Sequence, residues 1–297
     1  PDVQVADCEF NAAEIIKMVR EMEAEGARVM VFPELCITAY TCGDLFWQEN
    51  LLEEAKVQLM RIAEETADVD AIIFVGLPLE YKGKLYNVAA GLNHGEILGF
   101  VPKTYLPNYN EFYEARYFTS GEDVDGTVTI RRSEYGLHHD EEMTDEDVEF
   151  GLEAELEALE EEDSFEELEE IDEEPDYIDE DETEEFDEVD VPISSNILFI
   201  CQEMPKLKIA AEICEDLWVP NPPSVGHAYH GANLIVNLSA SDEVVGKDSY
   251  RKSLVSAQSA RLLCGYIYAT AGEGESTQDV VYGGHNLIAE NGTILAE

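Results

Sequence analysis

The stretch that decides how this chain folds runs Lys208-Ile-Ala-Ala-Glu-Ile-Cys-Glu-Asp-Leu-Trp218. Residues 209–213 form a mainly apolar run, which predicts a buried β-strand. This strand delivers Cys214 to a polar exit at Glu215 and Asp216. A cysteine in this place suggests a nucleophile. Because the thiolate is its reactive form, the chemistry requires a base and a positive charge nearby.

Two other stretches offer those groups. The run Val31-Phe-Pro-Glu34 predicts a strand that ends in a carboxylate, and the run Phe100-Val-Pro-Lys103 predicts a strand that ends in an ammonium group. Each motif is common by itself. The three together predict one site assembled at the ends of three strands.

Helical and strand patterns alternate along the rest of the chain, which predicts an α/β fold with helices covering a mixed sheet. The expected helices span residues 11–25, 50–67 and 248–264, the last of them capped by Gly265. The expected strands span residues 28–32, 71–76, 86–92, 97–101, 197–201, 232–238 and 266–270, with a closing hairpin over 287–296.

The net charge of −50 is concentrated in one segment. Between Glu122 and Asp190 lie 35 of the 67 acidic residues, opposed by Arg131 and Arg132. Such a segment has too little apolar content to offset the entropy of ordering. We therefore predict a largely disordered insertion over 122–190 that separates two parts of one domain, 1–121 and 191–297. The insertion is a solvated surface segment, a docking segment for a basic partner, or an adaptation to salt.

Composition also excludes several functions. A strongly acidic chain repels phosphate backbones and anionic lipids, so neither nucleic acid nor a membrane surface is an expected partner. No apolar window reaches the length of about 18 residues that a membrane span needs. The six cysteines form no disulfide framework, and the six histidines show no metal-ligand spacing with them. We expect a reduced, cytoplasmic protein without a metal site.

The segment 104–118 holds four tyrosines and two phenylalanines. These aromatic residues wall a small pocket, or they only pack a long loop. The glycine-rich segment 271–277 matches neither the phosphate-loop spacing nor the dinucleotide fingerprint, so it predicts no nucleotide site.

The order of strand-end glutamate, lysine and cysteine resembles the nitrilase (carbon-nitrogen hydrolase) superfamily. Within it, the chain is most similar to the glutaminase domain of glutamine-dependent NAD synthetases. The resemblance is carried by residues 32–35 with Tyr40, and by residues 103–109, 112–118, 213–218, 237–241 and 271–277. It implies a four-layer αββα sandwich and assembly into a homo-oligomer.

The resemblance also implies roles for individual residues. Glu34 matches the general base, Lys103 the group that stabilises the tetrahedral intermediate, Cys214 the nucleophile, and Glu114 a second glutamate that holds the lysine. The implied substrate is L-glutamine. The residues expected to bind it are Tyr40, Tyr109, Glu215, Ser241 and Lys247. Glu215 suits the α-amino group, whereas Lys247 and Ser241 suit the α-carboxylate.

The glutaminase step implied by the resemblance needs no cofactor. ATP and magnesium belong to a synthetase domain that receives the ammonia, and its pyrophosphate-loop motif does not occur in these 297 residues. We therefore expect a chain truncated at both ends, or one that passes ammonia to a separate protein. Two other functions remain open: an amidase acting on another small amide, and a non-catalytic interaction module that uses the acidic segment.

Overall fold

The computed structural model describes residues 1–131 and 188–297. Residues 1–129 and 190–297 form one compact unit, and residues 130–189 are assigned to a second.

The predicted insertion, 122–190, is too wide at both ends. Strand β5 covers Asp125–Arg131 and strand β6 covers Glu188–Ser194. The alternating, half-buried pattern of β5 is typical of a strand, and the acidic residues around it obscured this signal. Residues 132–187 lie outside the described residues.

Two six-stranded sheets form the centre of the larger unit. The first has the order β1-β2-β3-β4-β6-β5, and the second has the order β12-β11-β10-β9-β8-β7. The other strands of the first sheet are β1 (Val29–Val31), β2 (Ile72–Tyr81), β3 (Lys84–Asn93) and β4 (Glu96–Pro102). The second sheet consists of β7 (Phe199–Ile200), β8 (Lys208–Ile213), β9 (Leu234–Ser239), β10 (Gly265–Thr270), β11 (Leu287–Glu290) and β12 (Thr293–Ala296).

Both sheets mix parallel and antiparallel pairs. In the first sheet β1 runs parallel to β2, whereas β2, β3 and β4 are joined as antiparallel neighbours. In the second sheet β8, β9 and β10 are parallel, and β11 and β12 continue antiparallel. The prediction of mixed sheets is confirmed.

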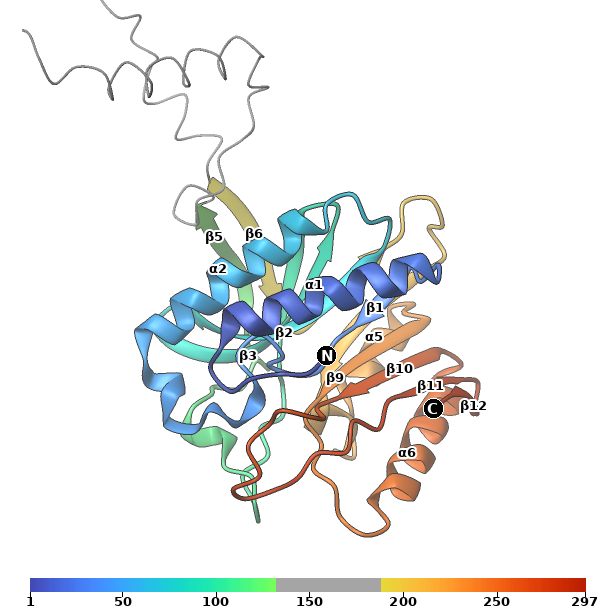
Figure 1. The fold of residues 1–297 in the computed structure, drawn as a ribbon. Helices are drawn as coiled ribbons and strands as arrows, with labels where there is room; N and C mark the ends of the chain where they lie inside the picture. The colour runs from blue at the N-terminus through green and yellow to red at the C-terminus, as the bar shows by residue number, and fades with distance from the viewer. Residues whose placement is uncertain (132–187) are drawn as a thin grey trace, which may run out of the picture. The chain divides into compact units, whose positions relative to one another are not determined.

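Helices cover the outer faces of the two sheets (Figure 1). Helices α1 (Cys8–Ala24) and α2 (Glu49–Glu65) pack on each other, and α2 contacts β2 and β4 of the first sheet. Helix α5 (Pro223–Tyr229) contacts β8, and α6 (Lys247–Leu262) contacts β10, β11 and β12. Short 3₁₀ helices span Tyr40–Trp47, Glu114–Arg116 and Cys214–Leu217. The resulting order of layers is helix, sheet, sheet, helix, as predicted.

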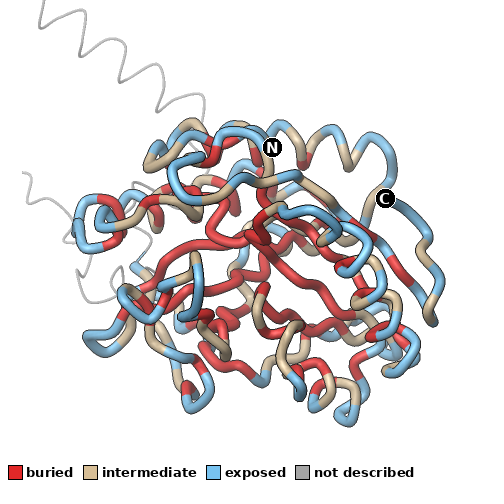
Figure 2. Tube along the Cα trace, turned by 90° about the horizontal axis from the view of Figure 1, so that it is seen from below, coloured by how far each residue is buried: buried red, intermediate tan, exposed pale blue. Residues whose placement is uncertain are grey.

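The main core lies between the two sheets. Its buried side chains come from β2, β3 and β4 on one side and from β7, β8 and β9 on the other, and include Phe74, Val101, Phe199, Ile213 and Leu238. Figure 2 shows buried residues following the strands through the middle of this unit. Burial of this apolar surface is the main stabilising term of the sandwich. No helix in the described ranges is both long and apolar enough to cross a membrane.

One predicted helix end is wrong. Helix α6 ends at Leu262, and Leu263 adopts the left-handed conformation with φ of +54°, whereas Gly265 opens strand β10. Glycine is the usual residue at such a helix end, so composition alone favoured Gly265. The start of β10 is fixed by its pairing with β9, which places Gly265 opposite Leu234.

The turn that carries Glu34 crosses β2 at Gly76. The Phe32 N–H donates to the Phe74 carbonyl at 2.9 Å, and the Ile37 N–H donates to the Gly76 carbonyl at 3.2 Å. A Cβ atom on Gly76 would lie 2.3 Å from the Leu35 nitrogen and 2.9 Å from the Pro33 oxygen. Only glycine leaves room for this turn.

We predict that Gly76→Ala lowers the free energy of unfolding by about 1–3 kcal/mol, because the methyl group must displace backbone atoms. Urea denaturation measures this loss. Gly226→Ala is the matched control, since a Cβ there meets no atom within 4 Å and alanine is the better helix former. Equal unfolding midpoints for the two variants would contradict the prediction.

Candidate active site

Lys103 lies at the centre of a buried cluster of charged residues. Its Nζ atom is 2.6 Å from Glu34 Oε1 and 2.7 Å from Glu114 Oε1. All three side chains are buried. Burial lowers the pKa of Lys103, but the carboxylates of Glu114 and Glu34 outweigh it and hold this pKa well above its ordinary value. The lysine is therefore charged at neutral pH.

Glu34 is held by both of its oxygens. Oε1 also accepts a hydrogen bond from Asn87 Nδ2 at 2.6 Å, and Oε2 accepts one from the Ala240 N–H at 2.9 Å. These contacts join β3 and the end of β9 to the turn after β1. The sequence analysis missed Asn87, although a polar residue inside the apolar run 86–92 is a usable signal of a buried hydrogen bond.

Cys214 begins the 3₁₀ helix that follows β8 and adopts φ of +44°, which is unfavourable for a residue with a side chain. Its N–H donates to Asn237 Oδ1 at 3.2 Å. Burial raises the pKa of the Cys214 thiol, and the charge of Glu34 adds to this effect while Lys103 opposes it. The thiol is protonated in this state, so a nucleophilic Cys214 needs a base.

The Asp216 carboxylate links the Cys214 turn to the segment after Lys103. It accepts hydrogen bonds from the Ile213 N–H at 2.9 Å, from the Tyr105 N–H at 2.8 Å and from the Thr104 N–H at 3.1 Å. Two strands from different sheets, β8 and β4, therefore end at a fixed separation. The sequence analysis quoted Asp216 in the stretch around Cys214 but assigned it no role.

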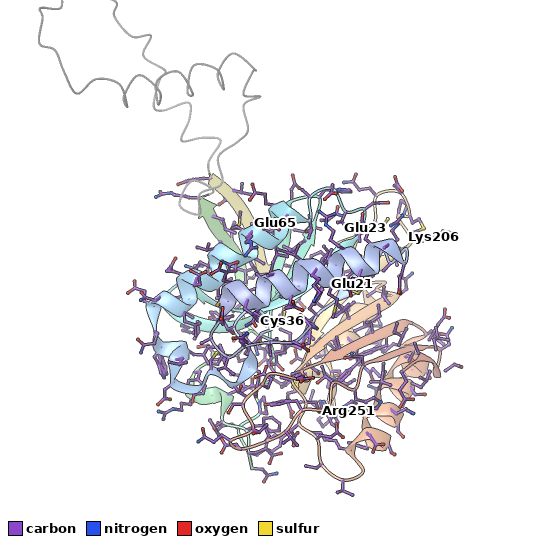
Figure 3. The ribbon with its side chains drawn as sticks, in the orientation of Figure 1. Glu21, Glu23, Cys36, Glu65, Lys206 and Arg251 are labelled. Carbon is purple, nitrogen blue, oxygen red and sulfur yellow. The ribbon has the colours of Figure 1, made fainter. Side chains whose placement is uncertain are left out.

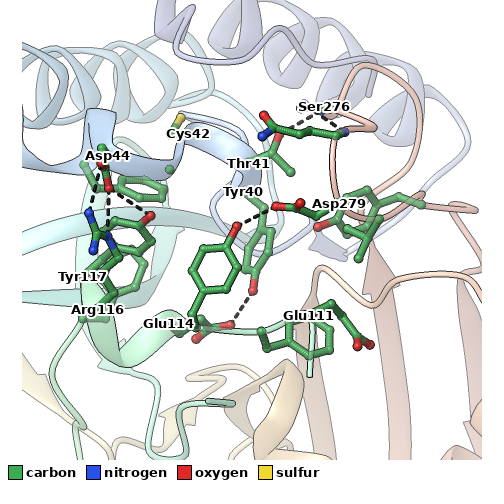
Figure 4. Close-up of a pocket in the computed structure, with 18 residues that line it drawn as sticks. Tyr40, Thr41, Cys42, Asp44, Glu111, Glu114, Arg116, Tyr117, Ser276 and Asp279 are labelled. Carbon is green, nitrogen blue, oxygen red and sulfur yellow. Dashed lines mark hydrogen bonds and ion pairs between the residues drawn. The ribbon is translucent and has the colours of Figure 1, made fainter. Parts of the chain in front are cut away.

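Glu114 and Tyr40 connect the charged cluster to a cavity of about 780 Å³. The Tyr40 hydroxyl donates to Glu114 Oε1 at 2.7 Å, as Figure 4 shows. Four aromatic residues of the 104–118 segment line the cavity, namely Phe112, Tyr113, Tyr117 and Phe118. The pocket-wall interpretation holds for these four residues, whereas Tyr105 and Tyr109 of the same segment are not in the lining. Cys214 does not belong to the lining, so the cavity reaches the cluster from the side of Glu114.

Three more of the predicted residues, Tyr109, Glu215 and Lys247, lie in two pairs of contacts. The Tyr109 hydroxyl donates to both oxygens of Glu215, at 3.0 and 2.9 Å. Lys247 forms an ion pair with the buried Asp242, and its Nζ lies 5.4 Å from the centre of the Trp218 ring. The sequence analysis did not anticipate that Asp242 already neutralises Lys247.

Ser241 is contacted by a cation that the sequence analysis missed. Arg251 from α6, labelled in Figure 3, is fully buried, and its Nη2 atom donates to Ser241 Oγ at 3.3 Å and to the Asp242 carbonyl at 3.2 Å. Its Nη1 atom also reaches Glu243 at 3.2 Å. Among the residues that the structure describes, no group of three His, Cys, Asp or Glu side chains is arranged to hold a metal ion.

Glu114 gives a testable dependence on pH. Burial raises its pKa from 4.5 to about 7, with the Lys103 charge opposing the shift and the Glu34 charge adding to it. Because the folded state binds this proton more tightly than the unfolded state, the contribution of Glu114 to stability falls as pH rises from 4.5 to about 7. The Oε2 atom has no hydrogen-bond partner within the described part of the chain and can carry the proton.

We expect Glu114→Gln to remove this titration. The difference in unfolding free energy, wild type minus variant, should fall by up to about 1.4 kcal/mol per pH unit across that window. Urea denaturation at a series of pH values measures it, with Glu111→Gln as the control for one charge in the same segment. Parallel curves for wild type and Glu114→Gln would show that Glu114 does not titrate there.

Comparisons with known proteins show which proteins this chain is similar to. A glutamine-dependent NAD(+) synthetase of Mycobacterium tuberculosis is 33% identical over 293 residues, covering 99% of this chain and 35% of that protein. The chain thus spans about a third of the length of such relatives. The crystal structure of a glutamine-dependent NAD(+) synthetase from Cytophaga hutchinsonii is similar with a TM-score of 0.71 and 26% identity, over 99% of this chain and 38% of that one.

A third comparison concerns the fold alone. An amidase of the nitrilase superfamily from Nesterenkonia superposes with a TM-score of 0.64 at 16% identity, over 100% of this chain and 82% of that one. Finally, the carbon-nitrogen hydrolase family model matches residues 3–297. The match covers both sheets, the buried lysine with its two glutamates, and the cysteine after β8, and this chain belongs to the carbon-nitrogen hydrolase family.

Proposed function

We propose that this chain hydrolyses the side-chain amide of L-glutamine and supplies the ammonia for the synthesis of NAD. The observation that carries the proposal is the buried Glu34, Lys103 and Glu114 cluster, whose charge acts on the pKa of the Cys214 thiol. The relatives named glutamine-dependent NAD(+) synthetase support the choice of substrate.

Each step of the proposed reaction uses a group that the fold holds in place. Glu34 takes the proton of the Cys214 thiol, and the thiolate attacks the amide carbon. Lys103 and the backbone N–H of Glu215 stabilise the oxyanion, and the loss of one such donor costs about 3 kcal/mol of transition-state stabilisation. The C–N bond breaks, ammonia leaves with the proton from Glu34, and a γ-glutamyl thioester remains on Cys214. Water activated by Glu34 then releases glutamate.

We assign substrate recognition to the two pairs of contacts beside the cluster. Glu215, oriented by the Tyr109 hydroxyl, accepts the α-ammonium group of glutamine. Lys247 and Ser241 bind the α-carboxylate, and Asp242 shares the charge of Lys247. Tyr40 orients Glu114 and faces the substrate from the cavity side.

The partners follow from the same proposal. The hydrolytic step uses protein side chains only, whereas ATP and magnesium serve the synthetase domain or subunit that consumes the ammonia. We further propose a cytoplasmic location, since all six cysteines are free thiols and a reducing compartment keeps them so. A homo-oligomer is the assembly that the resemblance to the glutaminase domains implies.

Labelling with a glutamine-analogue diazoketone tests the nucleophile. We expect 6-diazo-5-oxo-L-norleucine to add to Cys214 of the wild-type chain, glutamine to slow the reaction, and Cys214→Ala to lose both the adduct and ammonia release. Intact-protein mass spectrometry with peptide mapping measures the adduct. Cys201→Ala is the matched control and should keep both. Ammonia release by folded Cys214→Ala would refute the mechanism.

A pair of substrates tests the specificity. Glutaramic acid is glutamine without the α-amino group, so it cannot use Glu215. We expect the wild-type chain to prefer glutamine, and Glu215→Gln to raise KM for glutamine about tenfold while leaving KM for glutaramic acid unchanged, since a charge-assisted hydrogen bond is lost. Equal use of both amides by the wild type would favour an amidase with another small substrate. No turnover of any amide would favour the interaction module.

A further inference from the structure

A buried polar group lies behind Cys214, on the face of the second sheet that packs against α5 and α6. Glu212 of β8, Asn237 of β9 and Tyr266 of β10 belong to this group, and all three are at most 1% exposed. Apolar residues such as Ala210 and Ile235 belong to the same core cluster as Tyr266, and the buried Ser239 donates its hydroxyl to Asn237 Oδ1 at 2.8 Å. The register of the parallel strands places Glu212 directly beside Asn237.

These residues form a continuous chain of hydrogen bonds that ends at the nucleophile. The Tyr266 hydroxyl donates to Glu212 Oε1, and Asn237 Nδ2 donates to the Tyr266 hydroxyl at 3.2 Å. Asn237 Oδ1 then accepts the N–H of Cys214 at 3.2 Å. The second oxygen of Glu212 accepts the Ser224 N–H of α5 at 2.9 Å.

We propose that Glu212, acting through Tyr266 and Asn237, is a positioning residue that fixes the backbone of Cys214 for attack. This inference rests on the proposed function. A buried carboxylate is costly unless it is well hydrogen-bonded, and the hydrolytic mechanism above does not use Glu212. Its hydrogen bonds lead instead to the residue that does the chemistry.

The carboxylate sets the direction of the hydrogen bonds at Tyr266, and the Ser239 hydroxyl, which donates to Asn237 Oδ1 at 2.8 Å, supports the same orientation of the Asn237 amide. A carboxylate only accepts, so the Tyr266 proton must point to Glu212, which leaves the tyrosine oxygen to accept from Asn237. The amide nitrogen of Asn237 therefore faces Tyr266, and its oxygen faces the Cys214 N–H. Reversal of this amide would place two donors against each other at Cys214.

Cys214 needs such support because its backbone is strained. A residue with a side chain is unfavourable at φ of +44° and persists only where the surroundings hold it. The neighbouring Ile213 N–H is held by Asp216. The Cys214 N–H is held by Asn237, so the two sides of the turn are fixed independently.

Two substitutions that preserve volume test the proposal. Tyr266→Phe removes the acceptor for Asn237. In Glu212→Gln one of the two accepting oxygens is replaced by an NH₂ group. This donor then faces either the Ser224 N–H or the Tyr266 hydroxyl, which are themselves donors. We expect each variant to lower kcat for glutamine, per active site titrated with the diazoketone, about tenfold, with KM within twofold of wild type. The double variant should lose no more than either single one, because both break the same chain.

Tyr86→Phe is the control. It removes the hydroxyl of a buried tyrosine in β3 of the other sheet, outside this chain of hydrogen bonds, and should keep kcat within twofold. Melting temperatures of all variants show whether a variant is folded. Unchanged kcat in folded Tyr266→Phe, equal losses in Tyr266→Phe and Tyr86→Phe, or losses that add in the double variant would each overturn the proposal.

The rate at which p-nitrophenyl acetate acylates Cys214 separates this inference from the proposed function. That reaction needs a positioned thiol but no recognition of glutamine. A tenfold slower acylation in both network variants supports the inference even in a chain that does not hydrolyse glutamine. A wild-type rate of acylation in both overturns it even where glutamine is hydrolysed.

Discussion

The architecture of the site depends on one lysine shared by two buried carboxylates. Lys103 pairs with Glu34 and with Glu114, which lie on separate turns of the chain. An ammonium group taken out of water is costly unless anionic partners with good geometry compensate for it. The site therefore exists only when the ends of β1 and β4 and the segment 104–118 are held at fixed positions, which makes the cluster a product of the whole sandwich.

The turns that carry Glu34 and Cys214 are short and strained. Leu35, directly after Glu34, and Ala39, directly before Tyr40, have positive φ angles of +52° and +69°, as Cys214 does at +44°. Strain at functional positions persists because the surroundings determine the conformation. Here Gly76 admits the Glu34 turn, Asp216 ties the Cys214 turn to Thr104 and Tyr105, and Asn237 holds Cys214 itself.

The two sides of the charged cluster have different chemistry. The Glu215 side offers a carboxylate, the Tyr109 hydroxyl and the ion pair of Lys247 with Asp242. The Glu114 side opens into a cavity of about 780 Å³ that is lined by both aromatic and charged residues. Glu114 contacts both the lysine and the cavity, so its protonation state couples the interior of the site to the cavity wall.

The sequence by itself determined the alternation of strands and helices, the three strand-end residues Glu34, Lys103 and Cys214, and the site of the acidic segment. It did so because burial periodicity and motif order are local properties of the chain. Contacts that depend on sheet order and register can be identified only in the tertiary structure. Asn87 reaches Glu34, and Glu212 reaches Cys214 through Tyr266 and Asn237, because strands distant in sequence lie side by side. Hydrogen bonds extend over about 3 Å, so only the packed sandwich decides which buried polar groups meet.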